Sequence, residues 1–171
     1  MCNIVVQING KKRSVISVER NLKEKIIIEK IQNDKSLDKY LLEKKLFKTI
    51  YIKASSCAYI TVGTGIGVGL VVNGQPVHGL MHPEGGHLCV PRRAADASFD
   101  GPNTMDCFGG LTAENMCGSP ALTKRGALPS SAALATLADD DPLWEAAAHY
   151  LGALCANVVL LAAPEKIVLS G

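Results

Sequence analysis

The sequence predicts an α/β protein of two units: a small basic β-β-α-β unit over residues 1–53 and a larger α/β unit over residues 54–171. Three observations support this prediction. The charge and the glycine content change near residue 53, β-prone runs flank a glycine-rich turn after that point, and a long apolar helical segment precedes one last β-prone run. At 171 residues the chain is long enough for one ordinary domain or two small ones.

The charge of the chain is divided unevenly between the two units. Residues 1–53 carry 13 Lys and Arg against 6 Asp and Glu, whereas residues 54–171 carry 5 against 10. Gly10 is the only glycine of the first unit, and the other 15 glycines follow in the second. Such a break in composition indicates two units of different origin.

The first unit shows alternating and helical patterns in a short length. Residues 3–8 and 14–19 are β-prone, and Asn9-Gly10 between them favours a type I′ hairpin turn. Apolar residues spaced three to five apart then predict a helix over residues 22–31, and residues 49–52 predict a closing strand.

The excess of lysine in this unit has two interpretations: a solvated surface, or a surface for an anionic partner. The string IVVQINGKKRSVISVERNLKEKIIIEKI, followed by KYLLEKK and KTIYIK, resembles the C-terminal domain of bacterial-type leucyl-tRNA synthetase. The resemblance implies a tRNA contact through residues 3–53. No HIGH-like or KMSKS-like motif occurs in the sequence, so we expect no aminoacylation.

The second unit begins with a predicted hairpin and closes with a helix and a strand. Residues 58–62 predict a strand, residues 63–69 a glycine-rich turn, and residues 70–72 the next strand. Asn73-Gly74 then predicts a tight turn and a chain reversal. Towards the end, Asp141 and Pro142 predict the start of a long helix. Pro164 is predicted to end this helix before a final strand.

The glycine-rich turn is the first candidate binding element. Glycine lacks a Cβ, so the backbone of such a turn can approach phosphate oxygens, and Thr64 adds a hydroxyl donor. The turn joins two strands and therefore matches neither a Walker loop nor a dinucleotide fingerprint. A purely structural hairpin is the alternative. The segment HPEGGH at residues 82–87 adds a carboxylate and an imidazole three residues apart, which can both bond adjacent hydroxyls of a sugar.

The string AYITVGTGIGVGLVVNGQPVHGLMHPEGGH resembles the signature of ROK-family sugar kinases, particularly their fructokinase branch. The resemblance covers about residues 56–171 and implies part of an actin-like, ribonuclease-H-like kinase lobe. It implies ATP and Mg²⁺ as cofactors, a hexose as substrate (fructose to fructose 6-phosphate), a cytoplasmic location and a homodimer. By resemblance, nucleotide contacts fall on Gly63, Thr64, Gly65, Pro120 and Gly171, and sugar contacts on Glu84 and His87.

The sequence departs from the family pattern at the zinc site. The resemblance places two zinc ligands on His87 and Cys107, and Cys89 and Cys117 are the residues that could substitute for the missing ones. The second sugar-contacting glutamate of the family falls on Gly109, and residues 112–117 are interpreted as an insertion.

A second departure concerns catalysis. Phosphoryl transfer to a hydroxyl needs a carboxylate base, which in the family belongs to an Asn-Asp pair well before the glycine turn. Asn33-Asp34 lies in the synthetase-like segment and lacks the strand pattern around it, so we assign no catalytic residue. We expect no efficient catalysis by this chain alone. A tRNA-binding module with an inert kinase remnant, and a chimeric or truncated product without activity, are the alternatives.

Neither secretion nor membrane insertion is expected. The longest apolar run, residues 151–163, is shorter than the roughly 18–20 residues that span a bilayer. The charged N-terminus lacks an apolar signal core. The 6 cysteines follow no spacing of a secreted framework, so we expect reduced thiols.

Overall fold

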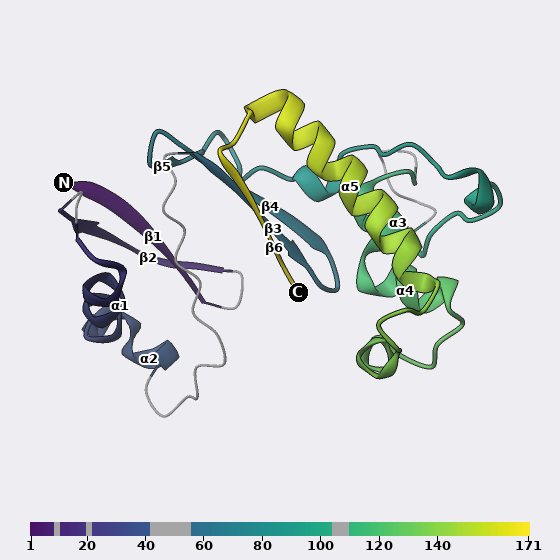
Figure 1. The fold of residues 1–171 in the computed structure, drawn as a ribbon, viewed down its shortest axis with the longest axis horizontal. Coiled ribbons are helices and arrows are strands. Elements are labelled where there is room, and N and C mark those ends of the chain that lie inside the picture. The colour runs from purple at the N-terminus through teal and green to yellow at the C-terminus, as the bar shows by residue number, and fades with distance from the viewer. Residues whose placement is uncertain (9–10, 20–21, 42–55, 104–109) are drawn as a thin grey trace.

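The computed structural model of the chain describes residues 1–8, 11–19, 22–41, 56–103 and 110–171 (Figure 1). The strands are β1 (Cys2–Ile8), β2 (Lys11–Val18), β3 (Cys57–Val62), β4 (Ile66–Val72), β5 (Gln75–Pro76) and β6 (Lys166–Ser170). The α-helices are α1 (Glu24–Gln32), α2 (Asp38–Leu41), α3 (Ala113–Cys117), α4 (Ser119–Arg125) and α5 (Leu143–Ala162). The 3₁₀ helices are η1 (Lys35–Leu37), η2 (Gly85–His87), η3 (Ala94–Asp96) and η4 (Ser131–Thr136).

The N-terminal segment folds as a hairpin followed by a helix, as predicted. Strand β1 pairs antiparallel with β2, with Cys2 opposite Val18 and Ile8 opposite Lys11. Helix α1 follows, and the buried apolar side chains of this part are Val6, Val18, Ile27 and Leu37. The predicted turn at residues 9–10 and the predicted strand at residues 49–52 lie outside the described residues.

A four-stranded mixed sheet, in the order β5-β4-β3-β6, forms the centre of the second part. Strands β3 and β4 are antiparallel, and β6 lies parallel to β3 on its other side. Asn73 and Gly74 both have positive φ, which confirms the predicted tight turn between β4 and β5.

Strand β4 begins earlier than predicted, at Ile66 rather than at Leu70. Ile66 and Val68 are buried, whereas the glycines between and after them fall on the opposite face. A β-carbon at Gly67 would lie 2.8 Å from the Thr61 hydroxyl, so glycine there allows close pairing with β3. The turn is therefore limited to residues 63–65.

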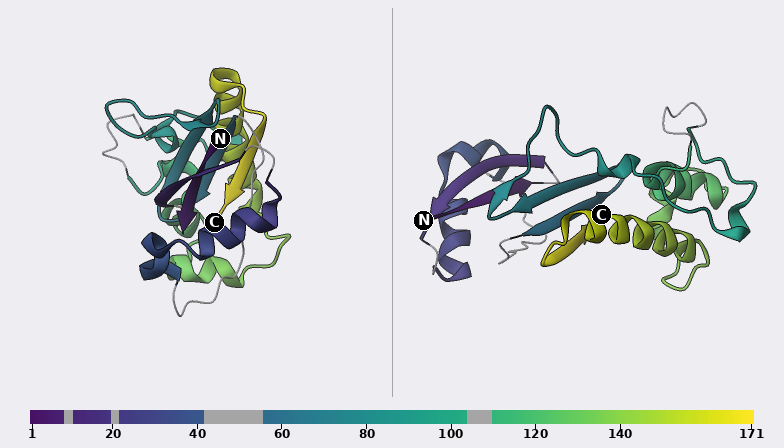
Figure 2. Two further views of the ribbon diagram at one scale, coloured as in Figure 1. Left: turned by 90° about the vertical axis from the view of Figure 1, so that its left-hand side faces the viewer. Right: turned by 90° about the horizontal axis from the view of Figure 1, so that it is seen from above.

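Helix α5 packs along one face of this sheet (Figure 2). Its buried residues share one side of the helix and are Leu143, Ala146, Ala147, Tyr150, Leu154 and Val158. They meet buried side chains of β3, β4, α3 and α4, including Ala58, Ile60, Ile66, Val68, Met116 and Leu122. This single cluster is the hydrophobic core of the second part.

Both ends of α5 follow the predicted signals. The Asp141 side chain accepts a hydrogen bond from the N–H of Leu143 at 2.8 Å, and Pro142 precedes the first helical turn. At the other end Ala163 adopts a left-handed conformation with φ of 40°, and Pro164 follows. The helix thus stops where β6 must begin.

By length and composition α5 is apolar enough to cross a membrane, in contrast to the expectation from its sequence. Six of its residues are nevertheless buried against the sheet and the neighbouring helices. Tyr150 also donates a hydrogen bond from its hydroxyl to Asp96 at 2.7 Å. In this fold α5 is a core helix, and its exposed leucines lie near its C-terminal end.

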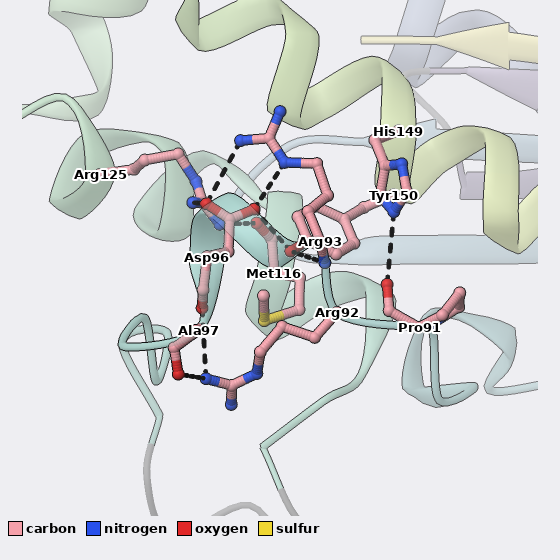
Figure 3. Close-up of polar contacts among 9 residues, drawn as sticks. All are labelled: Pro91, Arg92, Arg93, Asp96, Ala97, Met116, Arg125, His149 and Tyr150. Carbon is pink, nitrogen blue, oxygen red and sulfur yellow. Dashed lines mark hydrogen bonds and ion pairs between the residues drawn. The ribbon is translucent and has the colours of Figure 1, made fainter.

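An ionic cluster around Asp96 joins the segment after η2 to two helices (Figure 3). Asp96 is only 5% exposed and accepts hydrogen bonds from Arg93 at 2.6 Å, from Tyr150 of α5, and from Arg125 of α4. The guanidinium of Arg125 also lies 3.8 Å from the centre of the Phe99 ring. The hydrogen bonds from Arg93, Tyr150 and the charge of Arg125 lower the pKa of Asp96 to about 2.

The same segment is tied down beyond Asp96. Arg92 donates to the carbonyl oxygens of Asp96 and Ala97, at 3.3 and 2.8 Å. The Lys124 ammonium donates to the carbonyl oxygen of Gly101. Residues 91–101 therefore follow one fixed path over α4 and α5, which sets where residues 102–103 lie.

We expect Asp96→Asn to lower the free energy of unfolding near neutral pH by roughly 1–3 kcal/mol, because two partly buried arginines then lose their buried counter-charge. The pKa of Asp96 is lowered from 3.8 to about 2, so its contribution is complete above pH ~4 and is lost as the pH falls through about 2. Urea unfolding of both proteins at a series of pH values, from neutral pH down to about 2, measures both effects.

The exposed Asp140 provides the matched control. Asp140→Asn should leave the free energy of unfolding and its acid limb unchanged. Equal losses in the two variants would contradict the assignment of a stabilising role to Asp96.

Candidate functional site

The turn between β3 and β4 leaves backbone donors exposed. The N–H of Gly63 donates to the carbonyl oxygen of Gly65 at 2.9 Å, which closes the turn on itself. Within the described residues, the N–H groups of Thr64 and Gly65 make no hydrogen bond, and Thr64 is exposed. A β-carbon at Gly63 would meet no atom within 4 Å. The turn thus offers two unbonded N–H donors and one exposed hydroxyl, a set that suits an anionic ligand.

Glu114, on α3, holds the far side of this turn. Its Oε2 atom accepts a hydrogen bond from the N–H of Ile66 at 2.8 Å. A β-carbon at Gly65 would lie 2.6 Å from the same oxygen, so only glycine lets the carboxylate approach this closely. The conformation of the turn is therefore set by a side chain 48 residues away in sequence.

The start of α4 contacts the turn from a third direction. The N–H of Ser119 donates to the carbonyl oxygen of Gly63 at 2.8 Å. A β-carbon at Gly118 would lie 2.7 Å from the carbonyl oxygen of Glu114 and 3.4 Å from that of Thr64. Gly118 thus allows α3, α4 and the turn to meet, and it brings Pro120 next to Thr64.

The end of β6 reaches the same place. Ser170 lies opposite Thr61 in the parallel pairing of β6 with β3. A β-carbon at Gly171 would lie 2.9 Å from the carbonyl oxygen of Val62, directly before the turn. The structure therefore brings Gly171 beside the turn that it was predicted to accompany.

A cavity of about 330 Å³ opens between the turn, α3 and α4. Its lining residues are Thr64, Pro102, Asn103, Glu114, Asn115 and Pro120. Two residues predicted to contact nucleotide, Thr64 and Pro120, line this cavity together. Glu84 and His87 do not line it.

Glu84 and His87 flank the glycines of η2, which packs on β4. Glu84 is exposed and precedes η2, and its carbonyl oxygen accepts from the N–H of His87 at 3.0 Å. A β-carbon at Gly86 would collide with the carbonyl oxygen of Ile66, and one at Gly85 would lie 2.7 Å from Val68 side-chain carbons. The two glycines therefore allow η2 to lie directly on β4, next to the turn.

The described residues do not fit a zinc site. Over the described ranges, no group of three or more His, Cys, Asp or Glu is placed to hold a metal, and Cys107 lies outside those ranges. Cys117, one of the substitutes considered, is buried. Burial raises the pKa of its thiol to about 12, and its Sγ donates to the carbonyl oxygen of Ala113 at 3.2 Å. Cys117 is therefore a protonated core residue, and the substitution hypothesis is wrong for it.

Sequence reasoning missed Glu114. It interpreted residues 112–117 as an insertion, whereas Thr112 caps α3 through its hydroxyl and Ala113, Met116 and Cys117 are fully buried. Whatever their relation to the family pattern, these residues form a helix of the core rather than a surface loop. Gly109, the position assigned to the second glutamate, lies outside the described residues. The signal for α3 was the capping Thr112 followed by apolar residues at helical spacing.

Asn33-Asp34 has a structural role, in line with its exclusion from the site. Asn33 ends α1, and the Asp34 side chain accepts from the N–H of Ser36 at 2.9 Å to begin η1.

The sheet order, the long covering helix and the glycine turn define an actin-like, ribonuclease-H-like α/β lobe of the sugar-kinase class. The sequence profile of the ROK family matches residues 51–171, and the chain belongs to that family.

Named relatives agree with this assignment. A Bacillus subtilis (strain 168) protein, provisionally named a fructokinase, is 40% identical over 118 residues, which are 68% of this chain and 36% of that protein. A fructokinase of Lactococcus lactis subsp. cremoris is 34% identical over 115 residues, 66% of this chain and 37% of its own length. The chain thus spans about a third of the length of these relatives.

Solved structures show the same fold. The ROK hexokinase from Thermus thermophilus matches with a TM-score of 0.52 and 28% identity, covering 69% of this chain and 41% of its own. A ROK glucokinase from Streptomyces griseus, solved with glucose and AMPPNP, matches with a TM-score of 0.50, covering 69% of this chain and 45% of its own. At 20% identity the second match shows the fold alone.

A separate match concerns a different family. A leucine–tRNA ligase of Buchnera aphidicola subsp. Cinara cedri (strain Cc) is 40% identical over 50 residues, which are 29% of this chain and 6% of that protein. The match agrees with the resemblance of the first unit, over a short stretch.

We expect Gly86→Ala to lower the free energy of unfolding by roughly 1–3 kcal/mol, because the new β-carbon collides with the backbone of β4. Gly152→Ala is the control: Gly152 lies within α5 and a β-carbon there meets nothing within 4 Å. That variant should gain roughly 0.5–1 kcal/mol. Thermal and urea unfolding of both variants measure the difference, and similar stabilities would refute the close contact between η2 and β4.

Proposed function

We propose that residues 56–171 form the ATP- and hexose-binding part of a fructokinase-type kinase, whose full-length activity converts fructose to fructose 6-phosphate. The observation that carries this proposal is the turn of residues 63–65. Its N–H groups at Thr64 and Gly65 are unbonded, Thr64 lines a cavity, and η2, which Glu84 precedes, packs on β4 directly after the turn. Membership of the ROK family and the fructokinase relatives support it.

The donor set fits the phosphate groups of ATP. The two N–H groups and the Thr64 hydroxyl would hold phosphate oxygens, and Pro120 and Gly171 would border the rest of the nucleotide. The Glu114 carboxylate beside the turn disfavours a bare polyphosphate, so we propose that ATP binds as its Mg²⁺ complex. Mg²⁺ prefers oxygen ligands of this kind.

The sugar would lie on the η2 side of the turn. An exposed carboxylate at Glu84 can accept hydrogen bonds from sugar hydroxyls, and His87 lies three residues on in η2. Glu114 is a further carboxylate in this region, since α3 contacts η2. The arrangement offers several acceptors for a polyhydroxylated ligand.

We expect binding without efficient turnover from this chain alone. The Asn33-Asp34 pair caps helices in the N-terminal segment, and we assign it no part in phosphoryl transfer. By its kinship with soluble-type sugar kinases we place the protein in the cytoplasm and propose that it pairs with a second copy.

Calorimetric titration of the purified chain with MgATP and with fructose tests the proposal. We expect saturable binding of each ligand. Gly63→Ala should weaken MgATP binding about tenfold, roughly 1.4 kcal/mol, at an unchanged melting temperature, because its methyl group fills the open space above the turn. Glu84→Gln should weaken fructose binding and spare MgATP.

Gly152→Ala again serves as the control, because it adds a methyl group in open space on α5. It should bind both ligands as the unmodified chain does. Absence of binding for both ligands, or equal effects of Gly63→Ala and Gly152→Ala on MgATP, would overturn the proposal.

A second candidate function concerns residues 3–53. We propose that this basic segment contacts tRNA, because it resembles a tRNA-contacting synthetase domain and a leucine–tRNA ligase match exists. Lys23 and Lys25 at the start of α1 are exposed and available to phosphates.

Filter binding of tRNA across a salt series tests this contact. We expect a log–log slope of about −3 or steeper, because each neutralised phosphate releases counterions. The double variant Lys23→Glu, Lys25→Glu should weaken binding at low salt, whereas Lys166→Glu at the exposed start of β6 should not. A salt-independent affinity, or equal effects of the two variants, would exclude the contact.

A further inference from the structure

The side-chain amide of Asn115 connects two stems, residues 100–103 and residue 110, which lie on either side of residues 104–109 in the sequence. Asn115 lies on α3 and is 3% exposed. Its Nδ2 donates to the carbonyl oxygens of Asp100 at 3.2 Å and Gly110 at 2.7 Å, and its Oδ1 accepts from the N–H of Asn103 at 2.8 Å. Both donor hydrogens are used, and the oxygen holds the first stem a second time.

The backbone around this amide is shaped to accept it. Gly101 and Gly110 have φ of 67° and 75°, a conformation that favours glycine. A β-carbon at Gly101 would collide with the Asn115 side chain. Because Gly101 has no side chain, the first stem approaches the Asn115 amide more closely than any other residue at that position would allow.

The first of these stems forms part of the wall of the cavity beside the glycine turn. Pro102 and Asn103 line the cavity together with Thr64 and Pro120, and Asn115 itself lines it. The position of that wall therefore depends on the three hydrogen bonds of Asn115, together with the bond from Lys124 to Gly101.

The ROK resemblance implies a zinc ion at this part of the chain, yet the described residues do not offer a ligand set. Of the assigned ligands only His87 is described, and no group of three or more ligand-type side chains is placed to hold a metal in the described ranges. A structural zinc uses four ligands to fix chain segments relative to each other. Asn115 fixes two segments with three hydrogen bonds.

We propose that Asn115 takes the place of a structural zinc ion in this chain: its buried amide joins the stems at residues 100–103 and 110, so the cavity wall forms without metal. The role is one of positioning. It requires no contact between Asn115 and a bound ligand and holds whether or not ATP and hexose bind.

The unmodified protein provides the first test. Zinc content is measured after purification, and exchange of the Gly101, Asn103 and Gly110 amide hydrogens is followed before and after treatment with a zinc chelator. We expect substoichiometric zinc and unchanged protection. One zinc per chain, whose removal exposes these amides, would overturn the proposal.

Two isosteric substitutions provide the second test. Asn115→Asp keeps the acceptor for Asn103 and removes both donors, so protection of the Gly101, Asn103 and Gly110 amides should fall about tenfold or more. Asn157→Asp is the matched control, because Asn157 donates to the carbonyl oxygen of Cys89 at 3.1 Å and does not line the cavity. It should leave those three amides unchanged.

The two tests together decide the matter. Equal exchange in Asn115→Asp and Asn157→Asp would show that the amide does not hold the stems. If Asn115→Asp fails to fold, the chelator result on the unmodified protein still confirms or overturns the replacement of zinc. Neither readout uses ATP or fructose, so a failure of the proposed function is distinguishable from a failure of this inference.

Discussion

The hydrogen bond from the N–H of Ile66 to the Glu114 carboxylate is the interaction on which the candidate site depends. It joins the first residue of β4 to α3, so the glycine turn, the sheet and the helix have one relative position. The bond can form because Gly65 has no side chain to hold the carboxylate away. Thr64, with its unbonded N–H, lines the cavity as a consequence of this position.

Two buried polar residues, Asp96 and Asn115, fix the position of the connection between η2 and α3. Asp96 fixes the early part against α4 and α5 through Arg93, Arg125 and Tyr150. Asn115 fixes the later part on α3. A long connection without regular structure loses much entropy on folding, and buried, fully bonded polar groups are a specific means of holding one path. The wall of the cavity is thus built from polar contacts rather than from apolar packing.

Local patterns were enough to predict much of the fold. The strand pattern of residues 58–62, the positive-φ turn at Asn73-Gly74 and the capped helix from Leu143 all follow from short-range preferences. The start of β4 was mispredicted because Gly67 disfavours a strand on propensity, whereas pairing with β3 requires glycine opposite Thr61. The role of Glu114 was missed because nothing local connects it to a turn 48 residues earlier.

The sequence by itself determined most of the elements, the ROK ancestry and the identity of the turn, since glycine spacing and hydrophobic periodicity act over a few residues. The tertiary structure alone decided which distant residues meet at and around the turn. It placed Glu114 on the turn, Gly171 beside Val62 and Asn115 between two stems. These contacts join residues distant in the chain, and their existence depends on backbones approaching at positions where a β-carbon would not fit.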